Sequence, residues 1–477
     1  MNIGIILGTS IIIINILSML VLIFFERKNP TTTWAWLLVI MFLPVIGFIV
    51  YLLFGQTLTK EKMFSNKILT DQKKKEYFNK VKNQYKYKNE VLENIDIIQM
   101  NFRNTNAIYT QKNSVELFFQ GKSKFSRLFK EIKDAKKFIH MEYYIIQNDS
   151  IGNDLIELLT EKVKEGVEVK LLFDAMGSYK INNKKFLRKF TEAGGRYAAF
   201  FPSIIPHINL RINYRNHRKI VVVDGNKGFI GGFNVGDEYL GKDNKIGNWR
   251  DTHIIVEGEA VKELEERFLL DWAYASGEEL GNYNKYFEIN SLPSSSTGMQ
   301  IVSSGPDHEE PYIRNVYLKI LNKAMDYVYI QSPYFVPDET MLSALKLSSL
   351  SGVDVRIMIP GRPDHKFMSW AANSYIGELL EVGVKIYLYN NGFIHCKTAV
   401  SDNSVCTIGT ANMDIRSFDL NFETNAVIYD REISENLSKQ FIEDMNYCKQ
   451  VTLENFINRG RGSKIAESIV RLLSPIL

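Results

Sequence analysis

The sequence predicts an α/β protein in which two pseudo-symmetric lobes, each a mixed sheet flanked by helices, follow a two-helix transmembrane hairpin. Three observations lead to this fold class. A stretch rich in strand-forming residues occurs twice, at Asn216–Asn234 and Ile394–Asn412. Helical and strand-like patterns alternate in the same order around both copies, which is typical of an α/β protein. Two long apolar runs stand at the N-terminus.

The expected domain boundaries divide the 477 residues into four parts. They are the hairpin over residues 1–56, a basic linker over 57–108, a first lobe over 109–290 and a second lobe over 291–477. The segment Ser291–Gly298 reads SLPSSSTG, which is rich in turn-forming residues and marks the boundary between the lobes.

The two apolar runs predict the membrane hairpin. Ile3–Phe25 contains no charged residue and is long enough to cross about 30 Å of hydrocarbon as a helix. Trp34–Phe54 is a second such run that carries Pro44 and Gly47, which membrane helices tolerate. A signal peptide is the alternative for the first run, but it lacks a basic leading segment and a second run follows at once.

The lysine distribution predicts the orientation in the membrane. Ten lysines stand against three acidic residues between Thr57 and Lys88, whereas the loop between the apolar runs offers only Arg27 and Lys28. The positive-inside rule then places a multi-pass protein in the cell membrane with its long C-terminal part in the cytoplasm. The linker lysines either lie beside anionic headgroups, at about 1 kcal/mol each, or form a solvated charged linker.

The two halves share one plan of elements. In the first, an amphipathic helix precedes a strand at Phe138–Ile146, and a helix that ends at Gly166 precedes a strand at Val167–Phe173. The second half repeats this order around Gly352, and EGVEVK in the first half corresponds to SGVDVR in the second. We expect a largely parallel sheet in each half.

The C-terminal segment SKIAESIVRLLSPIL predicts an amphipathic helix. Ile465, Ile469, Leu472 and Leu473 form one apolar stripe. The stripe either packs on the rest of the protein or lies on the bilayer.

Composition excludes several classes of function. A net charge of only +4 argues against a dedicated nucleic-acid-binding protein. The three cysteines form no CxxC pair, so neither a zinc knuckle nor a thioredoxin-like site is indicated, and free thiols in a reducing compartment are expected. No GxxxxGK[ST] phosphate loop is present.

The duplicated stretch carries the candidate catalytic residues. Counted from the histidine, both copies have Lys at +2, Asp at +7, Gly at +14 and Asn at +17. These residues are His217, Lys219, Asp224, Gly231 and Asn234 in the first copy and His395, Lys397, Asp402, Gly409 and Asn412 in the second.

Each copy predicts a β-hairpin whose alternation separates these residues by role. Side chains two positions apart on a strand share a face, so each histidine and its lysine point the same way. Asp224 and Asp402 have the opposite parity and lie at the turns, where we expect them to brace the hairpin or its partner lobe. Asn234 and Asn412 end the returning strand near the level of the histidine.

A histidine beside a lysine indicates chemistry at phosphorus. The neutral imidazole can attack while the ammonium holds a non-bridging oxygen, but a leaving alkoxide also needs a proton. Two facing sets supply both: one histidine attacks, and the other, protonated, acts as general acid and later as general base. The sequence leaves both assignments open, with His217 preferred as the nucleophile over His395. The two lysines and two asparagines give donors for the developing charge. The remaining histidines form no HExxH array and a lysine would repel a cation, so no metal or cofactor is predicted.

The repeated HxKxxxxD pattern with its Gly and Asn resembles the signature of the phospholipase D superfamily. FIHMEYYII, IQSPYFVPDE, GNWRDTHIIVEG, GFIHCKTAVSD and RSFDLNFETNAVIYD further resemble the bacterial cardiolipin synthases. The likeness covers essentially the whole chain. Cys396 departs from it, because a small residue such as Ala is expected there.

The resemblance implies two phospholipase D-like lobes and a specific reaction. A histidine displaces glycerol from one phosphatidylglycerol, and the hydroxyl of a second then attacks the phosphatidyl-histidine to give cardiolipin in a reversible transfer. The implied partners are phosphatidylglycerol and an anionic membrane, with no nucleic acid and no stated oligomer. An acidic residue downstream of each motif is implied to orient a histidine; Asp251 and Glu423 match best, with plain salt bridges as the alternative.

Three other functions compete with this one. A phospholipase D hydrolase would use water as the second nucleophile, and another phosphatidyltransferase would use a different alcohol. A non-catalytic membrane scaffold is disfavoured because both motifs are complete.

Overall fold

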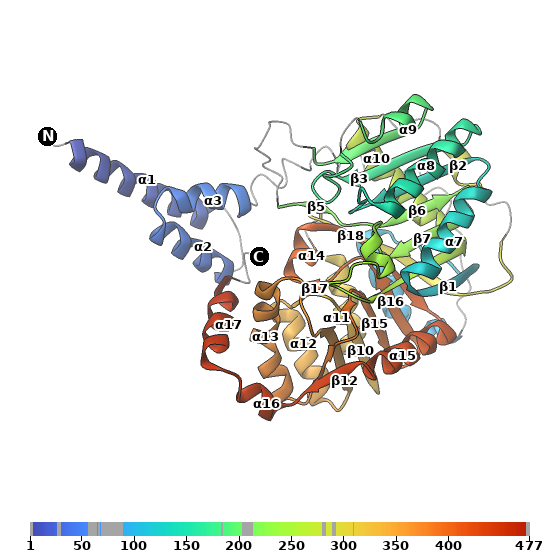
Figure 1. Cartoon of the computed structure of the whole chain (residues 1–477). Coiled ribbons are helices and arrows are strands. Elements are labelled where there is room, and N and C mark those ends of the chain that lie inside the picture. The colour runs from blue at the N-terminus through green and yellow to red at the C-terminus, as the bar shows by residue number, and fades with distance from the viewer. Residues whose placement is uncertain are drawn as a thin grey trace.

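The computed structural model describes residues 3–25, 30–55, 64, 67, 89–182, 185–202, 213–278, 283–288, 292–308 and 310–473. Two mixed sheets with helices on their faces form the body, and the N-terminal helices stand beside it (Figure 1). The predicted α/β class with two sheets is therefore confirmed.

The first sheet has the order β1-β8-β7-β6-β2-β3-β4. Its strands are β1 (Asn113–Gln120), β2 (Phe138–Tyr143), β3 (Glu168–Asp174), β4 (Arg196–Phe200), β6 (Ile220–Val223), β7 (Lys227–Gly231) and β8 (Trp249–Gly258). The helices are α7 (Gly121–Asp134), α8 (Ser150–Lys164), α9 (Arg188–Glu192) and α10 (Val261–Ser276), with 3-10 turns η2 (Asp237–Leu240) and η3 (Asn284–Tyr286). Strands β2, β3 and β4 are parallel, whereas β2 meets β6 antiparallel and the hairpin strands continue antiparallel to β1.

The second sheet repeats this plan with the order β19-β13-β12-β10-β15-β16-β18, and β9 also pairs with β18. Its strands are β9 (Gly298–Ser304), β10 (Tyr327–Gln331), β12 (Asp354–Pro360), β13 (Lys385–Tyr389), β15 (Thr398–Ser401), β16 (Val405–Gly409), β18 (Asn421–Tyr429) and β19 (Cys448–Val451). Its helices are α11 (Tyr312–Lys323), α12 (Glu339–Leu350), α13 (Lys366–Glu381), α14 (Ile415–Asp419) and α15 (Arg431–Met445). The expectation of a largely parallel sheet is wrong for both halves, because each repeated stretch inserts an antiparallel hairpin into the sheet.

Two short strands cross from one half to the other. Strand β5 (Arg215–Asn216), from the first half, pairs parallel with the start of β18. Strand β14 (Phe393–Ile394), from the second half, pairs parallel with the start of β8. Each crossing strand directly precedes a motif histidine, so the exchange places each histidine at the edge of the opposite sheet. A small third sheet pairs β11 (Phe335–Val336) with β17 (Met413–Asp414).

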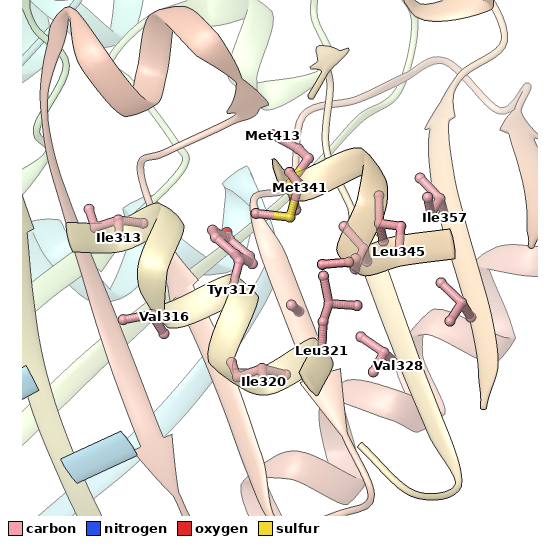
Figure 2. Packing of buried hydrophobic residues seen from close by; sticks show 14 of the residues in the cluster. Ile313, Val316, Tyr317, Ile320, Leu321, Val328, Met341, Leu345, Ile357 and Met413 are labelled. Carbon is pink, nitrogen blue, oxygen red and sulfur yellow. The ribbon is translucent and has the colours of Figure 1, made fainter. Parts of the chain in front are cut away.

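The two halves also share a hydrophobic core. In the second half, α11 and α12 pack Ile320, Leu321 and Leu345 against the sheet around Val328 and Ile357 (Figure 2). Another cluster joins α10 of the first half to β16 and β18 of the second, through residues that include Phe268, Trp272, Ile408, Phe422 and Ile428. Because this cluster belongs to both halves, the halves are held in one fixed arrangement.

The N-terminal segment forms three helices in place of the predicted two. They are α1 (Ile3–Phe25), α2 (Pro30–Phe42) and α3 (Ile46–Phe54). The run predicted over Trp34–Phe54 is broken between α2 and α3 at Pro44, which lacks an N–H donor, and Val45 there has a positive φ of 65°. Gly47 is required beside this turn, because a Cβ on it would lie 2.6 Å from the carbonyl oxygen of Val39.

None of the helices in the described ranges is both long enough and apolar enough to cross a membrane. The transmembrane hairpin predicted over residues 1–56 is therefore not supported by the structure.

The basic linker predicted over residues 57–108 lies largely outside the described residues, and its described parts are not a solvated chain. Lys67 is buried and forms ion pairs with Asp307 at 3.1 Å and Asp271 at 3.5 Å. Helices α5 (Asn89–Leu92) and α6 (Ile95–Thr105) follow, and α6 packs Ile97 and Ile98 into the core beside α11. Because the segment before residue 88 is rich in lysine, the sequence did not indicate that Ile97 and Ile98 are buried.

The C-terminal segment forms α16 (Leu453–Ile457) and the amphipathic helix α17 (Arg461–Leu473), which lies against α13 (Figure 1). The buried contact is Val470, and Arg471 donates a hydrogen bond to the Ser374 carbonyl at 3.0 Å. The predicted stripe instead faces outward, with Ile465, Ile469 and Leu472 exposed at 62%, 56% and 73%.

The motif aspartates occupy the hairpin turns, where φ is 53° at Asp224 and 50° at Asp402. The Asp224 carboxylate accepts backbone hydrogen bonds from residues 136–138 at 2.7–2.9 Å, just before β2. Asp402 accepts the equivalent bonds from residues 325–327, just before β10, at 2.8–3.1 Å. Each aspartate therefore ties its hairpin to the preceding helix–strand junction of its own half.

We predict that Asp224→Ala and Asp402→Ala each lower the free energy of unfolding by about 3 kcal/mol, because each leaves three backbone donors without a charged acceptor. Thermal unfolding and activity should fall together. Asp154→Asn, on the exposed face of α8, is the matched control and should keep the wild-type melting temperature. An Asp224→Asn protein that melts like the wild type but is inactive would contradict this bracing role.

Candidate functional site

The two motif histidines line one cavity of about 850 Å³ between the halves. Both are largely buried, His217 at 8% exposed and His395 at 7%. The exchanged strands explain the convergence, since the His217 backbone N–H donates to the Phe422 carbonyl at 2.9 Å and that of His395 donates to the Arg250 carbonyl at 2.7 Å. The structure thus brings together two residues that are far apart in the sequence.

Each histidine contacts a carboxylate from the opposite half. His217 Nδ1 lies 2.9 Å from Glu423 Oε2, and also 3.1 Å from the Thr410 carbonyl. His395 Nδ1 lies 2.7 Å from Asp251 Oδ2. With Nδ1 held as the donor by a carboxylate, Nε2 carries the lone pair, which in His395 lies 3.1 Å from Lys397 Nζ. Each imidazole therefore has a carboxylate of the opposite half at hydrogen-bond distance from its Nδ1.

Both motif lysines are buried, and neither lines the cavity. Lys219 Nζ donates to the His217 carbonyl at 2.5 Å, and Lys397 Nζ donates to the His395 carbonyl at 2.6 Å. Lys397 Nζ also lies 3.0 Å and 3.1 Å from the ring nitrogens of His395. The ring contacts place Lys397 on the same side of the chain as the His395 imidazole, whereas the shared face of His217 and Lys219 stays a prediction.

Burial keeps both histidines neutral in the free protein. It lowers the pKa of His217 to about 4 and that of His395 to about 3, with neighbouring lysines adding to the decrease and Glu423 or Asp251 opposing it. Burial likewise lowers the pKa of Lys219 to about 7. Burial would raise the pKa values of Asp251 and Glu423, but the facing lysines and histidines outweigh it and leave both lowered.

The asparagines have different environments. Asn234 Oδ1 accepts from the Ile145 N–H at 3.2 Å, and its amide donates to the Tyr239 hydroxyl at 3.1 Å. Asn412 is 5% exposed, and its buried Oδ1 has no hydrogen-bond partner among the described residues. Both line the cavity, whereas Asp224 and Asp402 do not.

Several residues that line the cavity lie outside the two motifs, and the sequence did not indicate them as site residues. The Tyr144 ring meets His217 at 4.8 Å and the Trp249 ring meets His395 at 5.1 Å, so an aromatic ring supports each imidazole. Arg215 and Arg416 also line the cavity. Arg215 stands two positions before His217, and strand parity applied to that residue could have identified it.

Known proteins resemble the chain over nearly its full length. Residues 128–272 and 317–445 match the family described as "Cardiolipin synthase, PLD-like domain", and residues 13–56 match "Phospholipase D-nuclease N-terminal". A cardiolipin synthase of Clostridium perfringens is 55% identical over 456 residues, which is 95% of each chain. The major cardiolipin synthase ClsA of Bacillus subtilis is 46% identical over 100% of both chains.

A solved structure shares the fold at low identity. The phosphatidylserine synthase of Haemophilus influenzae matches with a TM-score of 0.60 and 13% identity, covering 80% of this chain and 99% of that one. The family match and the two similar cardiolipin synthases establish the family to which the chain belongs. The chain belongs to the bacterial cardiolipin synthases of the phospholipase D superfamily, a family of phosphatidyltransferases.

Proposed function

We propose that this protein transfers a phosphatidyl group between two phosphatidylglycerol molecules, which forms cardiolipin and releases glycerol. The observation that carries the proposal is the pair of motif histidines that line one cavity, each beside its buried lysine and each with a carboxylate supplied by the opposite half. One phosphodiester replaces another, so the transfer is close to thermoneutral and reversible. It needs no nucleotide, cofactor or metal.

In the proposed first step, His217 Nε2 attacks phosphorus while Lys219 and Lys397 hold the non-bridging oxygens. The bond to glycerol breaks, and protonated His395 gives its proton to the departing oxygen. In the second step, the hydroxyl of another phosphatidylglycerol gives its proton to His395 and displaces His217 from phosphorus. Asp251 and Glu423 hold the imidazoles, and Asn234 and Asn412 lie at the edge of the reacting phosphate.

We further propose that the protein works at the surface of the cell membrane, with the two halves in the cytoplasm. Taking a diacyl lipid fully into water would cost on the order of 20 kcal/mol at about 0.8 kcal/mol per CH2. The N-terminal helices expose apolar side chains such as Ile12, Phe24 and Trp34, and α17 exposes its own stripe. The predicted lysine-rich segment, which would contact anionic headgroups, lies outside the described residues apart from Lys67.

Mass spectrometry of the lipid products is the main test. We expect purified protein in phosphatidylglycerol micelles to make cardiolipin and an equal amount of free glycerol, without ATP and in the presence of a chelator. Phosphatidic acid as the dominant product would show a hydrolase instead. A different phosphatidyl ester formed from an added alcohol in preference to cardiolipin would show another acceptor.

Both histidines should be indispensable, since one supplies the attack and the other the proton. We predict that His217→Ala and His395→Ala each reduce turnover by more than about 10³-fold without loss of thermal stability. His308→Ala, away from the cavity, should stay within about two-fold of the wild type. Near-normal activity in either motif variant would contradict the shared site, and mapping the trapped phosphohistidine should place it in the peptide that contains His217.

Attachment to membranes can be measured separately from catalysis. We expect full-length His217→Ala protein, in the absence of detergent, to float with phosphatidylglycerol vesicles in a density gradient. Retention of the protein at the bottom of the gradient, with intact vesicles at the top, would contradict the membrane location. Vesicles of neutral phosphatidylcholine measure how much of the binding depends on anionic headgroups.

A further inference from the structure

The cavity is larger than the transferred phosphate requires. Its volume of about 850 Å³ lies near the upper end of the roughly 300–1,000 Å³ found for small-molecule sites. The histidines and asparagines occupy only part of the lining. The remaining lining includes charged side chains that take no part in the proposed mechanism.

Two half-buried arginines line the cavity beside His217. Arg215 precedes His217 by two positions along the strand leading into the motif, so the two side chains share a face. Arg416 lies in α14 and donates to the side chain and the backbone carbonyl of Asn213 at 2.9 Å and 2.7 Å. These contacts hold Arg416 close to the strand that carries Arg215.

The arginine pair has no carboxylate at ion-pairing distance among the described residues, although the charges of Asp414 and Asp174 oppose the lowering of the Arg416 pKa. Neither Arg215 nor Arg416 forms an ion pair within the described part of the chain, and Arg215 donates to the Tyr214 carbonyl at 2.7 Å. Burial lowers the pKa of Arg416, and the charge of Arg215 adds to the decrease. Asp414 also lines the cavity, but it caps α14 by accepting from the Ser417 N–H at 2.6 Å.

The other charged groups of the cavity lie elsewhere on its lining. Asp364 accepts a hydrogen bond from the Tyr334 hydroxyl, and Glu238 belongs to η2 in the first half. Lys245 and Arg362 are exposed at the rim. A half-buried pair of like charges without an ion-paired carboxylate in the described part of the chain indicates a site for an anion.

The internal repeat does not duplicate the two arginines, which sets them apart from the residues that the two motifs share. In the register that aligns His217 with His395, Arg215 corresponds to Phe393 and Arg416 corresponds to Glu238. The histidine–lysine sets are duplicated, but these two neighbouring positions are not. They are cationic beside His217, whereas the equivalent positions in the other copy are aromatic at Phe393 and acidic at Glu238. Chemistry at the transferred phosphorus alone would not require this asymmetry.

We propose that Arg215 and Arg416 bind the phosphate of the acceptor phosphatidylglycerol and so select a lipid as the second nucleophile. This inference rests on the proposed function and specifies its acceptor. The acceptor carries its own phosphodiester one glycerol unit away from the attacking hydroxyl, whereas water and free glycerol carry none. The guanidinium groups bind phosphate oxygens through paired donors, and the flexible glycerol unit lets the hydroxyl reach the phosphorus held by the histidine.

The test compares two reactions of the same full-length enzyme. Cardiolipin formation needs the acceptor phosphate, whereas exchange of labelled glycerol into phosphatidylglycerol uses the same phosphatidyl-enzyme with an acceptor that has no phosphate. We expect Arg215→Gln and Arg416→Gln to lower cardiolipin formation by about 10- to 100-fold each while glycerol exchange stays within about three-fold of the wild type. Arg215→Lys should recover part of the loss, because it keeps the charge.

Arg188→Gln, an exposed arginine on α9, is the matched control and should leave both reactions unchanged. Equal loss of both reactions in the arginine variants at an unchanged melting temperature would overturn the acceptor subsite, and so would unchanged cardiolipin formation. If the wild type exchanged glycerol but made no cardiolipin, the proposed function itself would fail. The two ideas are therefore separable in one set of assays.

Discussion

The pairing of each motif histidine with a carboxylate from the opposite half is the interaction on which the site depends. Glu423 contacts His217 and Asp251 contacts His395, so neither half contains both members of a histidine–carboxylate pair. Strands β5 and β14 make the exchange possible, because each pairs with the strand that carries the partner carboxylate. An isolated half would lose both the orienting carboxylate and the strand that positions its histidine.

Buried ion pairs and hydrogen bonds stabilise the exchanged strands. Arg218, fully buried, donates to the Glu423 carbonyl at 3.2 Å and the Thr424 hydroxyl at 3.0 Å, and pairs with Asp271 at 2.6 Å. Lys67, from the predicted linker, reaches the same Asp271. Beside His395, Arg250 of the first half plays the corresponding part by pairing with Asp444 of the second half at 2.8 Å. Removing one member of such a buried network leaves an uncompensated charge, so the network fixes the geometry above it.

Periodicity and duplication were enough to predict the two-sheet α/β class, the hairpins and the shared face of each histidine and lysine. They also placed Asp224 and Asp402 at the turns. The exchange itself could not be predicted, because a two-residue strand such as β5 has no periodicity and its partner is remote in sequence. The apolar run Trp34–Phe54 was predicted to be a single span, because hydropathy alone does not indicate the helix break at Pro44. Arg215 and Arg416 lie in segments that have no matching chemistry in the other copy, so the repeat could not reveal them.

The surroundings of the site link its protonation to the presence of substrate. In the free protein the pKa values of about 4 and about 3 leave both histidines neutral at pH 7, so His395 cannot yet donate a proton. A bound phosphodiester brings a negative charge between the imidazoles, which raises the pKa of His395 and that of Lys219 from about 7. Under the mechanism proposed above, substrate binding would therefore supply the charged lysine and favour the protonated acid of the first step. Burial would keep the proposed nucleophile unprotonated before the anionic lipid binds, and the lipid's charge would then promote protonation of the proposed general acid.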